Sequence, residues 1–250
     1  MTDDNEVRDD TGRDFGDIVP WLSVGELDAL ARETGTDKSS TKHDYMRFYE
    51  AIFTPYRDST FTMLELGVGI PSRKAPSLRT WKTFFPRAEI VGVDIRKVSK
   101  EFEEDRIHVE LGDVSKPRVL RRIFNRWKPS IVVDDASHFW SHQITGFKTL
   151  FPMLPPGGVY ICEDVQTSFG ARQGESKFAD HPESFWEFIA RLQTGIAAGR
   201  SHVTITNRGE QRLVAWIDAI LVSRKTVAII KRQSVYRRDL PRPASKTADQ

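Results

Sequence analysis

The sequence predicts an α/β fold in which a doubly wound, mostly parallel β-sheet lies between two layers of helices. Two observations predict it. Short apolar segments rich in β-branched residues alternate with longer amphipathic segments along most of the chain, which indicates repeated βαβ units. The short segments are also apolar at consecutive positions, as is typical of strands that are buried on both faces.

The first two thirds of the chain contain the parallel part of this sheet. Its expected strands are 61–66, 89–95, 107–111, 130–135 and 158–164. The helices expected between them are 76–85, 116–127 and 142–154. Residues 21–53 are expected to form helices that lie over the sheet.

The last third of the chain continues with a helix and then strands. A further amphipathic helix is expected at 181–196, beginning around Pro182. Strands are expected at 201–207, 215–223 and 226–232, the last two forming a hairpin around Arg224 and Lys225. Because the strands of a hairpin are antiparallel, the sheet should gain an antiparallel C-terminal edge.

Length and composition favour one domain at 21–233, with tails at 1–20 and 234–250 that are polar and expected to be disordered. The 37 basic and 35 acidic residues nearly cancel, so no overall field indicates nucleic acid or a membrane surface as a partner. Cys162 is the only cysteine, which excludes an internal disulfide. With no apolar run long enough to span a bilayer and no leader pattern, we expect a cytoplasmic protein.

Acidic and glycine residues follow the first three strands, where ligands bind in open α/β sheets. Glu65 lies at the end of the first strand and Gly67 and Gly69 follow it, Asp94 ends the second, and Asp113 follows the third. Glycines there allow a sharp turn and close approach to a ligand, and a carboxylate after the second strand can bind a ribose diol. A tight βα turn and helix N-caps are the alternative, structural explanations. Three acids in this order favour a nucleoside cofactor.

A second acidic cluster follows the fourth and fifth strands. Asp135 is at the end of the fourth, and Glu163 and Asp164 are at the end of the fifth. Neighbouring carboxylates repel one another unless a cation lies between them, and oxygen ligands suit Mg²⁺ or Ca²⁺. His138 lies in the next turn, where a neutral imidazole can act as a base. His142 is expected on the helix, in a structural or supporting role.

Four segments carry a resemblance to a known family. They are GTDKSSTKHDYMRFYE at 35–50, SLRTWKTFFP at 77–86, DDASHFWSHQ at 134–143 and LFPMLPPGGVYICEDVQTSF at 150–169. Together they resemble the metal-dependent, S-adenosylmethionine-dependent sugar O-methyltransferases that modify macrolide glycosides. A mycobacterial O-methyltransferase of the methylmannose polysaccharide is a second candidate relative. The resemblance implies a Rossmann-like class I methyltransferase fold with a seven-stranded sheet.

The resemblance also implies roles for individual residues in cofactor binding. Glu65, Gly67 and Gly69 would bind the methionine end of S-adenosylmethionine, Asp94 the ribose and Asp113 the region of the adenine. Arg73 to Ser77, in the segment expected near the methionine end, depart from the family pattern, which has a Gly-Gly before the serine.

For the second cluster, the resemblance implies that Asp135, Glu163 and Asp164 bind Mg²⁺ and that His138 is the general base. Ala136 departs from the family pattern, which has glycine there. The expected reaction is methyl transfer to a hydroxyl of a sugar, glycoside or oligosaccharide, and a homodimer is the expected assembly. The segment 167–184 is a candidate lid over the acceptor.

Two other functions are compatible with parts of the pattern. His138, His142 and Asp135 could form the site of an iron- or zinc-dependent oxygenase or hydrolase, although that leaves Glu163 and Asp164 unexplained. A non-catalytic S-adenosylmethionine-binding protein is the other alternative. A nucleic-acid methyltransferase is disfavoured, because no basic stripe with interleaved aromatic residues is present.

Overall fold

The computed structural model describes residues 22–69, 72, 74–170, 177–199, 205, 207–235 and 240. They form a seven-stranded sheet with the order β3-β2-β1-β4-β5-β7-β6. The strands are β1 Thr62–Leu66, β2 Glu89–Asp94, β3 Ile107–Leu111, β4 Ile131–Asp134, β5 Val159–Cys162, β6 Ile217–Ser223 and β7 Thr226–Lys231. β1 to β5 are mutually parallel, and β7 is antiparallel to both β5 and β6. The predicted parallel sheet and C-terminal hairpin are thus confirmed.

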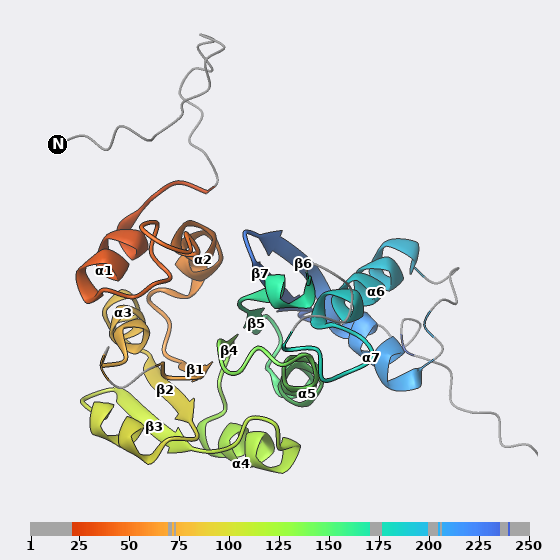
Figure 1. The fold of residues 1–250 in the computed structure, drawn as a ribbon. Coiled ribbons are helices and arrows are strands. Elements are labelled where there is room, and N and C mark those ends of the chain that lie inside the picture. Colours follow the sequence, from red (N-terminus) through yellow and green to blue (C-terminus); the bar gives the residue numbers. More distant parts are fainter. Residues whose placement is uncertain are drawn as a thin grey trace, which may run out of the picture.

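Helices cover both faces of the sheet, as predicted (Figure 1). One layer consists of α1 Glu26–Thr34, α2 Met46–Phe53 and α3 Pro76–Phe84. The other consists of α4 Pro117–Trp127, α5 Trp140–Leu150, α6 Phe185–Ala198 and α7 Arg208–Trp216. Short 3-10 helices are η1 Thr54–Tyr56, η3 Lys97–Phe102, η4 Phe151–Met153 and η5 Val165–Ser168.

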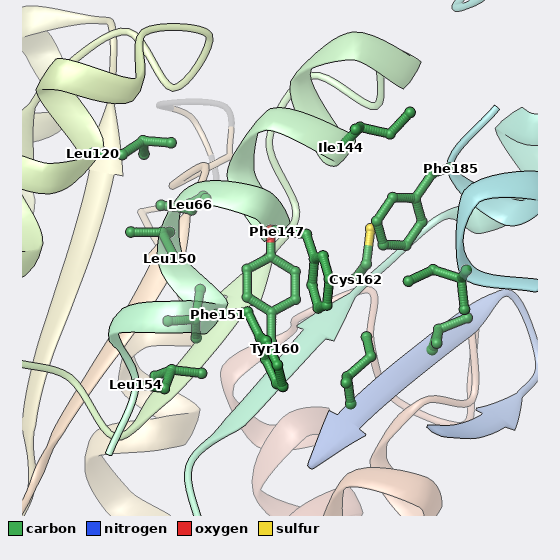
Figure 2. Close-up of a cluster of buried hydrophobic side chains, with 14 of the residues drawn as sticks. Leu66, Leu120, Ile144, Phe147, Leu150, Phe151, Leu154, Tyr160, Cys162 and Phe185 are labelled. Atoms are coloured by element: carbon green, nitrogen blue, oxygen red, sulfur yellow. The ribbon is translucent and has the colours of Figure 1, made fainter. Parts of the chain in front are cut away.

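The two faces of each parallel strand contribute to different hydrophobic clusters, because successive side chains of a strand point to opposite sides. On β5, Val159 and Ile161 pack toward α1, α2 and α3, whereas Tyr160 and Cys162 pack toward α5 and α6. Figure 2 shows the second cluster, in which Phe147 of α5 lies against Tyr160 with ring centroids 5.3 Å apart. The consecutive apolar residues seen in the sequence therefore fill two cores at once.

The second half of the chain differs from the prediction in two places. The helix expected from Pro182 begins at Phe185, because Ser184 and Glu187 form a reciprocal capping box. A helix that the sequence did not indicate, α7, precedes β6. The side chain of its N-cap residue, Asn207, accepts hydrogen bonds from the backbone N–H groups of Gly209 and Glu210. The strand predicted at 215–223 therefore starts at Ile217.

Several predictions lie wholly or mainly outside the described residues. They concern the tail at 1–20, most of the tail at 234–250 and most of the strand expected at 201–207. Within the part of the chain that the structure describes, no helix has the length and apolar character needed to cross a membrane.

The order of the strands reverses between β1 and β4. The chain proceeds outward from β1 to β2 and β3, and then returns to place β4 on the other side of β1. In open α/β sheets, such a switch point leaves a crevice beyond the carboxyl ends of the strands, where ligands bind. The two strands that flank this point, β1 and β4, each lead into one of the two acidic clusters of the sequence.

Candidate active site

The carboxyl ends of β4 and β5 bring the second acidic cluster together. The two strands are paired in parallel, with Asp134 opposite Cys162. Glu163 N donates to the carbonyl oxygen of Asp134 at 2.9 Å, so pairing continues one residue beyond the strands. Asp135 and Asp164 consequently leave neighbouring strand ends at the same edge of the sheet.

Three side chains at this edge, which we call the group of three, form a compact set of potential metal ligands. Asp135, His138 and Asp164 each offer one ligand atom, and these atoms lie within 4.8 Å of one another. His138 Nε2 lies 3.5 Å from Oδ2 of Asp164 and 3.9 Å from Oδ1 of Asp135. The sequence-predicted base and two of the three predicted ligands are therefore adjacent.

The backbone at this group is unusual. His138 has a φ of 60° and Asp164 a φ of 53°, in the left-handed region that disfavours residues with a Cβ. Such conformations cost about 1–3 kcal/mol each and occur preferentially at functional sites. The fold thus accepts backbone strain at two of the three residues whose ligand atoms converge.

The third predicted ligand, Glu163, makes different contacts. Its Oε2 accepts a hydrogen bond from Nζ of Lys38 at 2.6 Å, and its Oε1 accepts one from the hydroxyl of Tyr49 at 2.7 Å. Burial and the neighbouring Asp135 carboxylate raise the pKa of Glu163 well above its usual value, while Lys38 acts in the opposite direction. Glu163 lies beside the group of three, but both of its oxygens are engaged by the chain.

Lys38 supplies the positive charge among these acids. Its ammonium also donates to Oδ2 of Asp135, and it lies 3.8 Å from Oε1 of Glu65. Burial alone lowers the pKa of Lys38, but the three surrounding carboxylates raise it well above its usual value. The sequence predicts that a metal ion separates the acids Asp135, Glu163 and Asp164. In the structure, a buried lysine already separates Asp135 from Glu163.

Tyr45 fixes the carboxylate of Asp164. Its hydroxyl donates to Asp164 Oδ1 at 2.6 Å, and the side chain is almost completely buried. Burial by itself raises the pKa of Asp164, but the hydrogen bond from Tyr45 and the nearby His138 contribute to a net pKa below the usual value. Asp164 therefore remains ionised near neutral pH and is available to a cation.

Neither Lys38 nor the two tyrosines were identified from the sequence. They lie 97 to 125 positions from their partners among Asp135, Glu163 and Asp164, and no local spacing links them to these acids. The only signal was their position inside the segment 35–50, which carries part of the family resemblance.

The predicted cofactor residues lie at the ends of β1 and β2. Gly67 and Gly69 have φ values of 92° and 80°, so both adopt conformations that favour glycine. A Cβ added at Gly67 would lie 2.2 Å from the carbonyl oxygen of Asp135, so this loop passes directly against the other acidic strand end. Asp94 faces the same loop and accepts a hydrogen bond from the N–H of Val68 at 3.3 Å.

Arg96 also contacts the carboxylate of Asp94, and its Nη2 donates to the carbonyl oxygen of Gly69 in the glycine loop. Its backbone N–H donates to Asp94 Oδ1 at 2.8 Å, and its Nη2 donates to Oδ2 at 2.8 Å. Burial alone would raise the pKa of Asp94, but the hydrogen bonds from Arg96 lower it overall. Asp94 is thus an ionised acceptor at the glycine loop, which suits a hydroxyl-bearing ligand.

The two other acids predicted for the cofactor have different environments. Glu65 is buried on the α3 side, where it accepts hydrogen bonds from Ser77 Oγ at 2.8 Å and from Trp81 Nε1 at 2.6 Å. Asp113 lies in the loop after β3, where its side chain is 39% exposed and accepts the N–H of Ser115 at 2.9 Å. Glu65 is therefore tied to α3, whereas Asp113 is open to a ligand.

The segment that departs from the family pattern also has left-handed backbone. Lys74 and Ala75 have φ values of 54° and 51°. Ile70, Pro71 and Arg73 of the same loop lie outside the described residues. The described part of this segment therefore places two residues that carry a Cβ in the left-handed region.

The turn after β4 separates the two histidines. His142 is on α5, as expected, and its Nδ1 lies 2.6 Å from Ser137 Oγ. His138 precedes the helix, and its Nδ1 is buried without a hydrogen-bond partner among the described residues. The geometry therefore separates their roles, and His142 lies outside the group that could bind a metal.

Part of the candidate lid at 167–184 lies against this turn. The ring of Phe178 makes an edge contact with His138, with centroids 6.0 Å apart. The backbone carbonyl of Phe178 and the carboxylate of Asp180 accept N–H groups of the first turn of α5, at 3.1 and 2.9 Å. Residues 177–180 are thus attached to α5, whereas 171–176 lie outside the described residues.

The donor set fits a hard divalent cation. Asp135 and Asp164 supply carboxylate oxygens, which are the ligands that Mg²⁺ prefers, and Mg²⁺ typically keeps several waters besides one or two carboxylates. The set does not match the two histidines and one carboxylate of non-haem iron sites, because His142 bonds to Ser137 instead. An oxygenase is therefore disfavoured by geometry.

The strand order, the glycine loop and the acidic strand ends define the class of fold: a Rossmann-like domain of the class I methyltransferase type. A solved structure that is similar to the chain is the MycE methyltransferase of the mycinamycin biosynthetic pathway, in complex with Mg and SAH. The TM-score is 0.73 at 29% sequence identity, over 84% of this chain and 55% of that one.

The curated relatives are sugar O-methyltransferases, so the predicted resemblance is confirmed. The chain is 41% identical to the 8-demethyl-8-alpha-L-rhamnosyl tetracenomycin-C 2'-O-methyltransferase of Streptomyces olivaceus over 178 residues, which cover 69% of this chain and 46% of that protein. It is 39% identical to the mycinamicin VI 2''-O-methyltransferase of Micromonospora griseorubida over 148 residues, which cover 58% of this chain and 37% of that protein. The chain thus spans about half or less of the length of the curated relatives that it matches. No protein-family model matches it.

Proposed function

We propose that the protein transfers a methyl group from S-adenosylmethionine to a hydroxyl of a sugar or glycoside, with the assistance of Mg²⁺. The observation that carries the proposal is the convergence of Asp135, His138 and Asp164 beside the glycine loop of β1. This convergence supports a cation site and a base next to the region where the cofactor would bind. The similarity to sugar O-methyltransferases supports the same reaction.

Asp135 and Asp164 would hold the metal, with Glu163 as the third acidic residue of the site. When bound, Mg²⁺ would orient the acceptor hydroxyl and make it more acidic. Glu163 would act as a ligand only if it shares an oxygen that now accepts from Lys38 or Tyr49. Its role as a ligand is therefore the part of the proposal that most needs a direct test.

His138 would be the general base that removes the proton of the acceptor hydroxyl. Mg²⁺ prefers oxygen to nitrogen ligands, so the imidazole remains available for this proton although it lies among the acids. Orienting the hydroxyl and the methyl donor can contribute roughly 7–11 kcal/mol at most, so positioning would supply most of the rate enhancement. Deprotonation by His138 would add to it.

The cofactor would lie along the ends of β1, β2 and β3. Gly67 and Gly69 would allow its methionine end to approach the backbone, and Asp94 would accept hydrogen bonds from the ribose hydroxyls, in place of some of those from Arg96. Asp113 would face the adenine. Glu65 would act from behind the loop, because Ser77 and Trp81 occupy its oxygens.

Incubation with Mg²⁺, labelled S-adenosylmethionine and a panel of glycosides that carry free hydroxyls tests the proposal. Label should enter a glycoside, chelation should abolish the transfer, and added Mg²⁺ should restore it. Mg²⁺ should also raise the melting temperature, because it binds only the folded form. Cofactor binding without transfer to any glycoside would instead indicate a non-catalytic binding protein. Methyl transfer restored by iron but not by Mg²⁺ would contradict the assignment of Mg²⁺ to the site.

Two broader properties remain proposals. A homodimer is the assembly we expect, and sedimentation of the purified protein would test it. A cytoplasmic location is expected from the sequence and can be tested by fractionating cells of the source organism.

A further inference from the structure

Two donors from the N-terminal segment hold the acids of the group of three in a similar way. Lys38 Nζ donates to Oδ2 of Asp135, while the other oxygen, Oδ1, faces His138 at 3.9 Å. Tyr45 donates to Oδ1 of Asp164, while Oδ2 faces His138 at 3.5 Å. In both acids, one oxygen is bound by a donor and the other faces the centre of the group.

The donors are themselves fixed. Lys38 and Tyr45 are 2% and 1% exposed, so neither side chain is free to move into solvent. The backbone N–H of Tyr45 donates to the carbonyl oxygen of Lys38 at 2.9 Å, which closes the loop between the two residues. One helical turn later, Tyr49 donates to Glu163. A single short segment thus contacts all three predicted metal ligands.

We propose that Lys38 and Tyr45 are positioning residues of the metal centre, which lock Asp135 and Asp164 in the orientations that bind the ion. This inference rests on the proposed function, since it assumes that the group of three binds Mg²⁺. A carboxylate rotates about one bond, so fixing one oxygen also fixes the direction of the other. Outer partners of this kind commonly affect metal affinity by roughly 10- to 100-fold.

A purely structural role for the same donors gives a different expectation. In that case, the hydrogen bonds would only satisfy buried polar groups, and their loss would lower stability without a specific effect on metal binding. Tyr45→Phe separates the two accounts, because it removes one hydroxyl and leaves the charge of the site unchanged. Tyr56→Phe is the matched control, since that hydroxyl also donates one hydrogen bond, to the carbonyl oxygen of Gly157 at 2.6 Å.

The experiment measures Mn²⁺ affinity by the free-ion signal in electron paramagnetic resonance, and Mg²⁺ affinity by competition. We expect Tyr45→Phe to weaken binding of both ions by roughly tenfold or more, whereas Tyr56→Phe leaves it unchanged. Affinity for S-adenosylmethionine should be the same in both variants. Equal metal affinity in Tyr45→Phe and Tyr56→Phe would overturn the inference, and so would a parallel loss of cofactor affinity in Tyr45→Phe.

Lys38→Met tests the other donor, Lys38, because loss of its charge and loss of its positioning role change the cation affinity in opposite directions. Loss of a neighbouring positive charge alone would strengthen cation binding, whereas release of Asp135 would weaken it. Weaker Mn²⁺ binding supports a positioning role for Lys38, and tighter binding overturns it. Absence of metal binding in the wild-type protein would contradict the metal in the proposed function itself, so the two failures are distinguishable.

Discussion

The Nζ atom of Lys38 lies 2.6 Å from Oε2 of Glu163, although 125 positions separate the two residues in the sequence. Both side chains are only 2% exposed. A buried ion pair is costly to break, because the charge that remains has neither water nor a partner. The acidic strand ends are therefore partly neutralised by the chain itself, before any metal ion binds.

Lys38→Met should strongly destabilise the metal-free protein. The substitution leaves Glu163 and Asp135 without their buried counter-charge, and breaking such a pair costs about 3–5 kcal/mol. Urea unfolding in the presence of a chelator measures the loss. Lys100→Met is the control, because Lys100 pairs with Glu103 at the surface and such exposed pairs contribute about 0–1 kcal/mol.

The double variant Lys38→Met/Glu163→Gln should recover part of this stability. Glu163→Gln removes one of the unpaired charges, and replacing both members of a buried pair is less costly than removing one. Equal stability of Lys38→Met and Lys100→Met would show that Lys38 is not an essential counter-ion.

Glu65 should make stability depend on pH. Burial raises the pKa of Glu65 from 4.5 to about 7, with Lys38 acting against this shift. Below pH 4.5 the group is protonated in both folded and unfolded chains and carries no penalty. Between these pH values, the unfolded chain loses the proton first, so the folded state becomes relatively less stable, by about 3 kcal/mol once the pH exceeds 7.

Glu65→Gln isolates this effect. The glutamine oxygen can still accept from Trp81, and its amide can donate to Ser77 Oγ, so the packing is retained. Urea unfolding at pH 5 and pH 8 should show the wild type losing stability relative to the variant as the pH rises. Parallel changes in the two proteins would mean that Glu65 titrates normally.

The architecture could be predicted from the sequence because strong local patterns determine it. The apolar run at Ile131–Asp134 and the amphipathic segment at Pro117–Trp127 form β4 and α4 nearly as predicted. Helix α7 was missed, because its apolar residues merge into the strand that follows and only its cap, Asn207, marks the start. Short helices that run directly into strands lack the breaker residues on which such predictions depend.

The candidate site could be predicted only in part, for a related reason. Acids at strand ends are visible in the sequence, because parallel strands bring their carboxyl ends to one edge, and Asp135 and Asp164 do meet there. Lys38 and Tyr45 reach the same edge from the connection between α1 and α2, and no periodicity specifies the long-range packing of this segment over the sheet. Glu163 was expected to bind Mg²⁺ with Asp135 and Asp164, and the structure gives it two protein partners that the sequence did not indicate.

Asp94→Ala should weaken binding of S-adenosylmethionine without unfolding the protein. Hydrogen bonds to a charged acceptor contribute about 1.5–3 kcal/mol, which corresponds to roughly 10- to 150-fold in affinity. Calorimetric titration with the cofactor measures the change. Asp105→Ala is the control, since that carboxylate is 88% exposed and lies in the same part of the chain. Equal affinities of the two variants would remove Asp94 from the cofactor site.

His138→Ala should lower turnover by roughly 10²–10⁴-fold, the usual contribution of a general base, while the protein still binds S-adenosylmethionine and Mg²⁺. Retained metal affinity is the informative part, because His138 Nε2 lies close enough to Asp135 and Asp164 to be a ligand itself. His142→Ala is the control, since that ring is four residues further on and is held by Ser137 outside the group. A His138→Ala variant that loses Mg²⁺ and turnover together would be a ligand mutant, and the base would have to be sought elsewhere. Nearly full turnover in His138→Ala would mean that the acceptor hydroxyl loses its proton to solvent or to one of the carboxylates.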